Sequence, residues 1–377
     1  MKIAVAIDSF KGSLTSLEAG MAVMEAVKRL DSNAEVIVKP LADGGEGTVQ
    51  ALSGRADAET VKITVHGPLM EPLTAEYCIL KDTGTAVIEM ASASGITLIP
   101  PEKRNPMKTT TLGVGEMIGD AIKRGCRKFI VGIGGSATND GGTGMLKALG
   151  YELLDKNGNP VAQGAGGLKD LAEIRTENAV PELKECFFNV ACDVKNPLCG
   201  EAGCSAVFGP QKGADPDMVA DMDKWLGSYA LLARTVSDKA DEKAEGAGAA
   251  GGLGFAFLSF LNSRLESGIK LILEEICLED DIKDADIVVT GEGRLDAQTV
   301  MGKAPAGVAA LAKKYGKKVI AFSGCVTEDA EICNEYGIDA FFPVLRSVCS
   351  LDEALDKDNA YRNLMATAYQ VFRLILK

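Results

Sequence analysis

The chain has 377 residues, of which 46% are hydrophobic and 25% charged, and it carries a net charge of -13. This composition is typical of a globular protein with enough material for two or three domains. The acidic balance argues against nucleic acid as a partner, and no apolar run of about 18 residues is present to span a membrane.

Cysteine and histidine usage excludes several kinds of site. Ten cysteines are scattered without a Cys-x-x-Cys pair, and His66 is the only histidine. A zinc site and a Ser-His or Cys-His nucleophile are therefore poorly supported. Several cysteines lie in or beside apolar strands, and the N-terminal apolar run is too short for a signal peptide. We expect a cytoplasmic protein with reduced cysteines.

The first 60 residues alternate between predicted strands and helices. Residues 2–7 and 35–41 indicate buried strands, and residues 17–30 indicate a helix with Ser16 as its N-cap. A second helix is expected to begin near residue 48. This β-α-β-α order favours a parallel sheet.

The pattern changes near residue 60. Three strand-like runs at 61–65, 73–80 and 86–91, separated by turn residues, predict a meander. Beyond them, apolar spacing predicts strands at 128–131 and 187–192 and helices at 113–124, 143–154, 216–243, 246–261 and 268–276.

The β-α-β pattern returns at residue 284. Strands are expected at 287–289, 319–322 and 340–344, with helices at 304–315 and 359–376. The two ends of the chain thus share one pattern. We expect an α/β fold with a discontinuous, doubly wound domain of mainly parallel strands (1–60 and 284–377) and a second α/β domain inserted at 61–283.

A glycine-rich turn between a strand and a helix occupies residues 132–146. Backbone N–H groups can converge on an anion at such a place. The turn lacks the Gly-Lys-Ser/Thr of a Walker loop and the third glycine of a dinucleotide fingerprint, and a tight structural turn is the alternative. The candidate phosphate contacts are Gly134, Gly135, Ser136, Asn139, Asp140, Gly141 and Gly142, with Gly251 and Gly252 of the Gly-Ala stretch 246–254.

Polar residues cluster at the carboxyl ends of five predicted strands. These clusters mix carboxylates with glycines or amides and fall at 8–11, 43–46, 136–140, 193–196 and 291–296. In open α/β sheets the ligand crevice lies at the carboxyl ends of the strands. We therefore expect a functional crevice there, between the two domains.

The charged residues of these clusters fit a phosphate and metal site. Asp43, Asp193 and Glu292 are the candidate Mg²⁺ ligands, because Mg²⁺ takes oxygen ligands and bridges to phosphates. N-capping or helix-dipole pairing is the alternative for Asp43, Glu46 and Glu292. Basic residues within or beside the clusters could neutralise an anion, although each alone could be a solvated surface charge: Lys11, Lys195, Lys212, Arg294 and Lys303.

With one histidine, a general base must be a carboxylate or a lysine. Phosphoryl transfer suits this limit, because its catalysis is mostly positioning and charge neutralisation. We choose Asp193 as the group that orients the attacking hydroxyl, since it ends a strand and Lys195 follows two residues later. An Asx-type turn before Pro197 is the alternative.

Six motifs together resemble the bacterial glycerate kinases, in order over essentially the whole chain. They are Asp8-Ser9-Phe10-Lys11-Gly12-Ser13, the stretch 42–48, Gly134–Gly142, Ala191–Leu198, Gly209–Ala214 and Thr290–Thr299. The resemblance implies Mg²⁺-dependent transfer from ATP to D-glycerate, in glyoxylate and sugar-acid catabolism. It also implies two α/β domains with the site between them. The product implied is 2-phosphoglycerate or 3-phosphoglycerate, and we favour the former.

Within this hypothesis, the turn 134–142 and the stretch 246–254 hold the ATP phosphates. Asp43 and Asp193, with Glu292, hold Mg²⁺ or orient the glycerate hydroxyl, while Asp8 and Ser9 contact the substrate. The glycerate carboxylate or the transferring phosphoryl group is bound by Lys11, Lys195 and Arg294. A homodimer is one option that the sequence leaves open. A non-catalytic two-domain binding protein for small acids is the alternative from another functional class, and a dinucleotide oxidoreductase is a more distant one.

Overall fold

The computed structural model describes residues 1–42, 47–53 and 57–376. The chain divides into two compact units: unit 1 comprises Met1–Gly54 and Ile269–Lys377, and unit 2 comprises Arg55–Gly268. The boundaries therefore fall near residues 54 and 268, whereas the sequence placed them near 60 and 284. The difference arises because the residues around 269–284 pack with unit 1 rather than with unit 2.

Unit 1 is built on a five-stranded parallel sheet in the order β13-β12-β11-β1-β2. β1 pairs with β2 on one side and with β11 on the other, so the direction of strand addition reverses beside β1. The strands are β1 (Lys2–Val5), β2 (Glu35–Val38), β11 (Ile287–Leu295), β12 (Lys318–Val326) and β13 (Ala340–Pro343).

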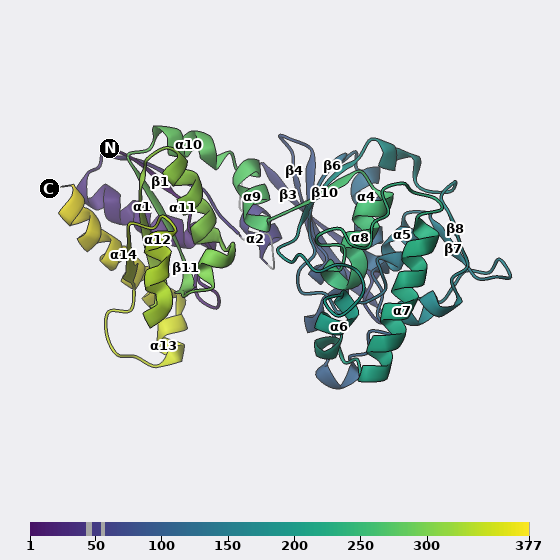
Figure 1. Cartoon of the computed structure of the whole chain (residues 1–377). Coiled ribbons are helices and arrows are strands. Elements are labelled where there is room, and N and C mark those ends of the chain that lie inside the picture. Colours follow the sequence, from purple (N-terminus) through teal and green to yellow (C-terminus); the bar gives the residue numbers. More distant parts are fainter. Residues whose placement is uncertain (43–46, 54–56, 377) are drawn as a thin grey trace. The chain divides into compact units, whose positions relative to one another are not determined.

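Helices cover both faces of this sheet (Figure 1). On one face α1 (Ser16–Leu30) and α14 (Lys357–Ile375) pack against each other and against Ile3, Val5 and Val289. On the other face α10 (Leu278–Asp284) contacts β1, and α11 (Ala304–Lys314) contacts β11. The remaining helices are α2 (Thr48–Ser53), α9 (Gly268–Glu275), α12 (Ile332–Glu335) and α13 (Leu351–Leu355).

The N-terminus of α1 corrects one expectation. Thr15, rather than Ser16, is the N-cap: its side chain accepts from the backbone N–H of Glu18, and the Glu18 carboxylate accepts from the backbone N–H of Thr15. This capping box is a local sequence signal. The hydroxyl of Ser16 is buried and donates instead to the carbonyl of Ile7, which ties the helix start to the segment that follows β1.

Unit 2 is built on a six-stranded mixed sheet in the order β10-β9-β6-β5-β4-β3. β3 and β4, and β4 and β5, pair antiparallel as the predicted meander, whereas β5, β6, β9 and β10 run parallel. The strands are β3 (Ala58–His66), β4 (Pro72–Leu80), β5 (Thr85–Glu89), β6 (Lys128–Gly132), β9 (Phe187–Ala191) and β10 (Ser263–Glu266), and a separate hairpin contains β7 (Glu152–Leu154) and β8 (Glu173–Arg175).

The core of unit 2 lies between this sheet and its helices. Phe129 of β6 stacks on Phe188 of β9 with ring centroids 4.6 Å apart, and Phe188 also meets Phe257. The α-helices are α3 (Ala91–Ser94), α4 (Leu112–Lys123), α5 (Thr143–Ala148), α6 (Cys204–Phe208), α7 (Pro216–Ala233) and α8 (Ala249–Phe260). The α/β fold class predicted from the sequence is confirmed.

Two predicted helices are too long. The helix expected over 143–154 ends at Ala148, because Gly150 adopts a left-handed conformation and Leu153 lies on β7. The helix expected over 216–243 ends at Ala233, and turns follow. Apolar residues at helical spacing continued past both ends, so spacing alone did not mark the stops. In the described part of the chain, no helix is long and apolar enough to cross a membrane.

Candidate functional site

In unit 1 the predicted residues gather at the carboxyl edge of two adjacent strands. Asp8, Ser9 and Lys11 follow β1, and Glu292 and Arg294 lie on the last residues of β11, the neighbour of β1. The backbones are close here, because a Cβ added to Gly293 would lie 3.3 Å from the backbone nitrogen of Lys11. This edge is the topological switch point, where α/β sheets bind ligands.

The loop 8–15 forms a polar cavity of about 390 Å³. Asp8 is mostly buried, and its carboxylate accepts from the backbone N–H of Ser9 at 2.7 Å. Ser13 donates to the carbonyl of Phe10 at 3.0 Å, which closes the loop. The cavity is lined by Ser9, Lys11, Gly12, Ser13 and Thr15, together with Phe10, Leu14 and Gly47, and Lys11 is exposed. Hydroxyls, backbone amides and one ammonium are suited to a small polar anion.

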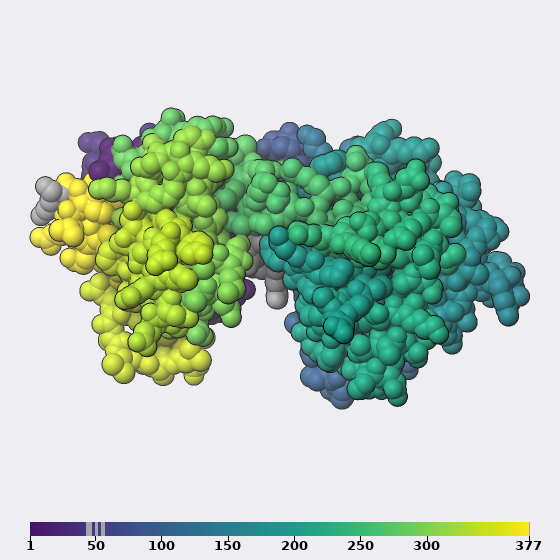
Figure 2. Space-filling model, in the orientation of Figure 1, coloured from purple at the N-terminus to yellow at the C-terminus, as the bar shows by residue number. Residues whose placement is uncertain are grey.

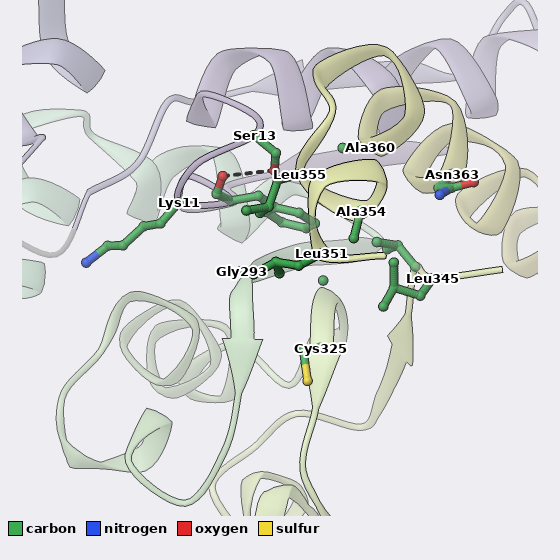
Figure 3. Close-up of a pocket in the computed structure, with 13 residues that line it drawn as sticks. Lys11, Ser13, Gly293, Cys325, Leu345, Leu351, Ala354, Leu355, Ala360 and Asn363 are labelled. Atoms are coloured by element: carbon green, nitrogen blue, oxygen red, sulfur yellow. Dashed lines mark hydrogen bonds between the residues drawn. The ribbon is translucent and has the colours of Figure 1, made fainter. Parts of the chain in front are cut away.

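A second cavity of about 190 Å³ lies beside the first and has a different chemistry. Leu345, Leu351, Ala354 and Leu355 line it, with Gly293 and Cys325 from the ends of β11 and β12 (Figure 3). The Lys11 side chain extends away from these apolar residues in this view. The cavity is therefore a poor site for a small hydroxy acid.

The segment that carries the apolar lining also reaches the surface. Leu345 is 42% exposed, Leu351 is 73% exposed and Val348 is fully exposed. These residues belong to the yellow stretch that precedes α14 at the surface of unit 1 (Figure 2).

At the end of β11, carboxylates and cations form one network. Thr299 donates to the Glu292 carboxylate at 2.6 Å. The Lys303 ammonium lies 3.4 Å from Asp296 and 3.9 Å from Glu292, and Arg294 lies 3.4 Å from Asp296. Glu292 is 8% exposed, so its charge is balanced inside the protein rather than by water. None of these contacts is an N-cap, which together with helix-dipole pairing was the alternative that the sequence left open for Glu292.

In unit 2 the glycine-rich turn follows β6 and splits into an exposed and a buried half. Gly134 and Gly135 are exposed and Ser136 is half-buried, whereas Asn139 and Asp140 are fully buried. Only the first half presents its backbone and its hydroxyl to solvent, so only that half can contact a ligand directly.

The buried half is organised by Asp140. Its carboxylate accepts from the backbone N–H groups of Thr111, Gly142 and Gly144 at 2.9 to 3.2 Å, and from the Thr111 hydroxyl at 2.9 Å. Burial raises the pKa of Asp140, and these hydrogen bonds oppose the rise. Asn139 donates to the hydroxyl of Ser205 at 2.8 Å. Both side chains bond within the protein and hold the turn in shape.

The two glycine stretches of unit 2, the turn 134–142 and the stretch 246–254, pack directly against each other. Gly251 has a φ of +67° in the kinked start of α8, and its carbonyl accepts from the N–H of Gly141. A Cβ on Gly251 would lie 2.0 Å from the carbonyl oxygen of Thr138, and one on Gly252 would lie 2.8 Å from Cα of Gly141. Gly142 is likewise closed in by Ala256. Glycine is required here by backbone packing.

Lys212 lies beneath the exposed half of the turn. It ends the 3₁₀ helix Pro210–Lys212, is 2% exposed, and donates to the Ser136 hydroxyl at 2.8 Å and to the Thr138 carbonyl at 2.7 Å. Burial lowers the pKa of Lys212 to about 8. From the sequence, Lys212 was one of five basic residues that could neutralise an anion, but no particular contact was predicted for it.

Asp193 and Lys195 follow β9, the neighbour of β6 in the same sheet. Asp193 is exposed, and its carboxylate accepts from the backbone N–H of Gly268 at 3.2 Å. Lys195 forms a surface ion pair with Glu245, in which both side chains are more than two-thirds exposed. The contact of Asp193 at the start of α9 differs from the Asx turn before Pro197 that was its alternative.

The predicted magnesium ligands are distributed over both units. Asp43, like Glu46, lies outside the described residues, Asp193 belongs to unit 2 and Glu292 belongs to unit 1. Within residues 1–42, 47–53 and 57–376, no group of three or more histidine, cysteine, aspartate or glutamate side chains is placed to hold a metal ion.

Comparison with known proteins gives the family. A family model described as "Glycerate kinase family" matches residues 3–376. A "Glycerate kinase" from Haemophilus influenzae is 46% identical over 375 residues, covering 100% of this chain and 99% of the relative. A "Glycerate 2-kinase" from Escherichia coli is 45% identical and covers 97% and 98% of the two chains.

A solved structure agrees with the sequence matches. The crystal structure of a Salmonella typhimurium LT2 protein, provisionally named glycerate kinase 2, superposes with a TM-score of 0.92 at 44% identity. It covers 100% of this chain and 98% of the other. Sequence and structure agree over the full length, and the chain therefore belongs to the glycerate kinase family.

Proposed function

We propose that this chain transfers the terminal phosphoryl group of ATP to the 2-hydroxyl of D-glycerate with the help of Mg²⁺. The observation that carries this proposal is the full-length match to the glycerate kinase family. The preference for the 2-position rests on the Escherichia coli relative named "Glycerate 2-kinase", at 45% identity. Transfer to the 3-hydroxyl is the alternative outcome.

The exposed half of the glycine turn is our candidate for the ATP phosphates. Gly134 and Gly135 have no side chain to obstruct an approaching anion, and Ser136 adds a hydroxyl. The other residues that were predicted to contact ATP are buried, and we assign them an indirect role in which they hold this turn in shape. They are Asn139, Asp140, Gly141, Gly142, Gly251 and Gly252.

The polar cavity of unit 1 is our candidate for D-glycerate. A small hydroxy acid needs a cation for its carboxylate and hydrogen-bonding groups for its hydroxyls. Lys11 and Ser9 line this cavity, and Asp8 holds the backbone of Ser9 in place. Arg294 lies on the adjacent strand and retains an exposed guanidinium, so it is a second candidate for the carboxylate.

Asp193 is our candidate for orienting the attacking hydroxyl. It is exposed at the end of β9, and the N–H of Gly268 is directed at one of its oxygens. Lys195, nearby on the same loop, could neutralise the transferring phosphoryl group, although its pairing with Glu245 at the surface gives this assignment less support.

The carboxylates of this chain suit a magnesium ion that binds together with the nucleotide phosphates. Mg²⁺ keeps several waters and needs only one or two carboxylates besides the phosphates. Glu292 and Asp193 supply oxygen donors, with Asp43 as the third predicted ligand. Held by these carboxylates, the ion would supply positive charge that offsets the negative charge of the transferring phosphoryl group.

A cytoplasmic location accompanies this proposal. All ten cysteines are unpaired, which is typical of a reducing compartment. The homodimer stays a prediction.

A coupled assay of ADP formation tests the function. We expect ADP to form only when ATP, Mg²⁺ and D-glycerate are all present, and L-glycerate and tartronate serve as comparison substrates. A non-catalytic binding protein would bind D-glycerate in a calorimetric titration without nucleotide and would form no ADP. That pair of results would overturn the proposal.

A further inference from the structure

We propose that Lys212 and Ser136 form a charged relay that makes the Ser136 hydroxyl a donor to a phosphoryl oxygen of the nucleotide. The inference rests on the proposed function and names a component of that site. Lys212 is a positioning residue in this account, because it acts through Ser136.

The environment of Lys212 is unusual for a buried ammonium. Its two hydrogen-bond acceptors, the Ser136 hydroxyl and the Thr138 carbonyl, are both neutral. A buried charge without an adjacent carboxylate is costly to maintain. Asp140 is the acidic group that faces it, and the Asp140 oxygens are engaged by the backbone of Thr111, Gly142 and Gly144.

The local backbone fixes this lysine in position. Lys212 donates its own backbone N–H to the carbonyl of Gly209 at 2.9 Å. Gly213 follows with a φ of +94°, and a Cβ there would lie 2.3 Å from the carbonyl oxygen of Arg104. The ammonium is thus held beneath the turn by a helix end that has little freedom to move.

The direction of the hydrogen bond gives Ser136 its function. An ammonium can only donate, so the Ser136 oxygen must be the acceptor. The hydrogen of the Ser136 hydroxyl remains available, and Ser136 is half-buried next to the exposed Gly134 and Gly135. A donor polarised by a cation in a low-dielectric setting binds an anion more strongly than an isolated hydroxyl does. A phosphoryl oxygen at this turn would receive that hydrogen bond.

The charge state of Lys212 gives the relay a pH dependence. Burial lowers the pKa of Lys212 to about 8, while Asp140 and the Cys204 thiol favour its charged form. Below pH 8 the ammonium can donate to Ser136; well above pH 8 a neutral amine replaces it. The nucleotide affinity of the wild-type chain should therefore decrease as the pH rises through about 8.

Binding of a non-hydrolysable ATP analogue to the full chain, measured by calorimetry, tests the relay. Lys212→Met and Ser136→Ala should each weaken binding by about 10-fold or more, because a charge-assisted hydrogen bond is lost. Their effects should be strongly non-additive, because both variants break the same relay. Ser136→Thr, which keeps the hydroxyl, should restore most of the affinity.

Lys147→Met is the matched control. Lys147 of the same unit donates to the carbonyls of Val161 and Ala162 at 2.8 and 3.0 Å, and burial also lowers its pKa. Its replacement removes similar contacts away from the turn, so it should change thermal stability without changing nucleotide affinity by more than about twofold. The decrease in nucleotide affinity near pH 8 should persist in Lys147→Met, which keeps Lys212, and should be absent in Lys212→Met.

Three results would overturn the relay. In the first, Lys212→Met and Ser136→Ala both bind the nucleotide with an affinity within about twofold of that of Lys147→Met. The second is an effect confined to the KM for D-glycerate, and the third is additivity of the two substitutions. A wild-type chain that binds the analogue but forms no ADP with D-glycerate would refute the proposed function, and the binding measurements would still decide the relay.

Discussion

The loop after β1 in unit 1 and the turn after β6 in unit 2 bury their polar groups differently. In the loop 8–15, Lys11 and Gly12 are exposed and a polar cavity opens beside them. In the turn 134–142, Asn139 and Asp140 are fully buried, and the contacts described above join them to the turn itself and to other segments of unit 2. Polar residues at a strand end therefore serve two purposes, and burial distinguishes groups that build a loop from groups that can meet a ligand.

This difference predicts that substitutions in the turn change stability and substitutions in the loop change substrate binding. The largest effect is expected at Asp140. Replacing Asp140 by alanine leaves the N–H groups of Thr111, Gly142 and Gly144 without their acceptor inside the protein. The free energy of unfolding should decrease by about 3 kcal/mol or more.

Urea denaturation measures the Asp140 effect. Asp217→Ala, at an exposed acidic residue of α7, is the control and should cost no more than about 0.5 kcal/mol. A loss below about 1 kcal/mol for Asp140→Ala would contradict a structural role for the buried carboxylate.

The second effect concerns the exposed carboxylate of the same unit. Asp193→Asn keeps an oxygen acceptor for the N–H of Gly268 but removes the negative charge. Turnover should decrease by about 10² or more, because the attacking hydroxyl loses its orienting group. Nucleotide affinity and the urea midpoint should stay near their wild-type values. A near-normal rate would show that Asp193 does not orient the hydroxyl and that its role is limited to the structural contact with Gly268 at the start of α9.

The third effect separates two glycines of unit 2. Gly251→Ala places a Cβ against the Thr138 carbonyl at a φ of +67°, so the free energy of unfolding should decrease by about 2 kcal/mol. Gly134 has no heavy atom within 4 Å of an added Cβ, and Gly134→Ala should fold with nearly unchanged stability. Equal stability of the two variants in urea denaturation would contradict the packing of the two glycine stretches against each other.

The smallest of these effects is expected in unit 1. Lys11→Met should raise the KM for D-glycerate by about 10-fold, because the carboxylate loses one charged partner, and should leave kcat and stability little changed. Lys28→Met, at an exposed lysine of α1, is the control and should alter neither. An unchanged KM for Lys11→Met would remove Lys11 from the substrate site.

The placement of the candidate residues at strand ends could largely be predicted from the sequence, whereas their burial could not. Apolar runs that end in polar clusters located Asp8, Asp193 and Glu292 at the carboxyl ends of strands, because strand periodicity is a local signal. The burial of Asp140 depends on Thr111, which lies 29 residues away in sequence. No local pattern connects two such segments.

Other features were missed for the same reason. The glycines of 246–254 indicated a ligand loop, but Gly251 is needed for contact with Thr138, which only the folded chain brings near. Lys212 lies within the recognised motif Gly209–Ala214, yet its acceptor Ser136 is 76 residues away. Local capping was within reach of sequence reasoning, since Thr15 and Glu18 have the spacing of a capping box.

A ³¹P NMR spectrum of the wild-type chain with ATP, Mg²⁺ and D-glycerate tests the central claim most directly. We predict a new phosphate-monoester signal that requires every component and is split into a doublet by the single proton on C2 of 2-phosphoglycerate. A triplet from the two protons on C3 would contradict transfer to the 2-hydroxyl. Intact ATP with no new signal would contradict the assignment of this chain as a glycerate kinase.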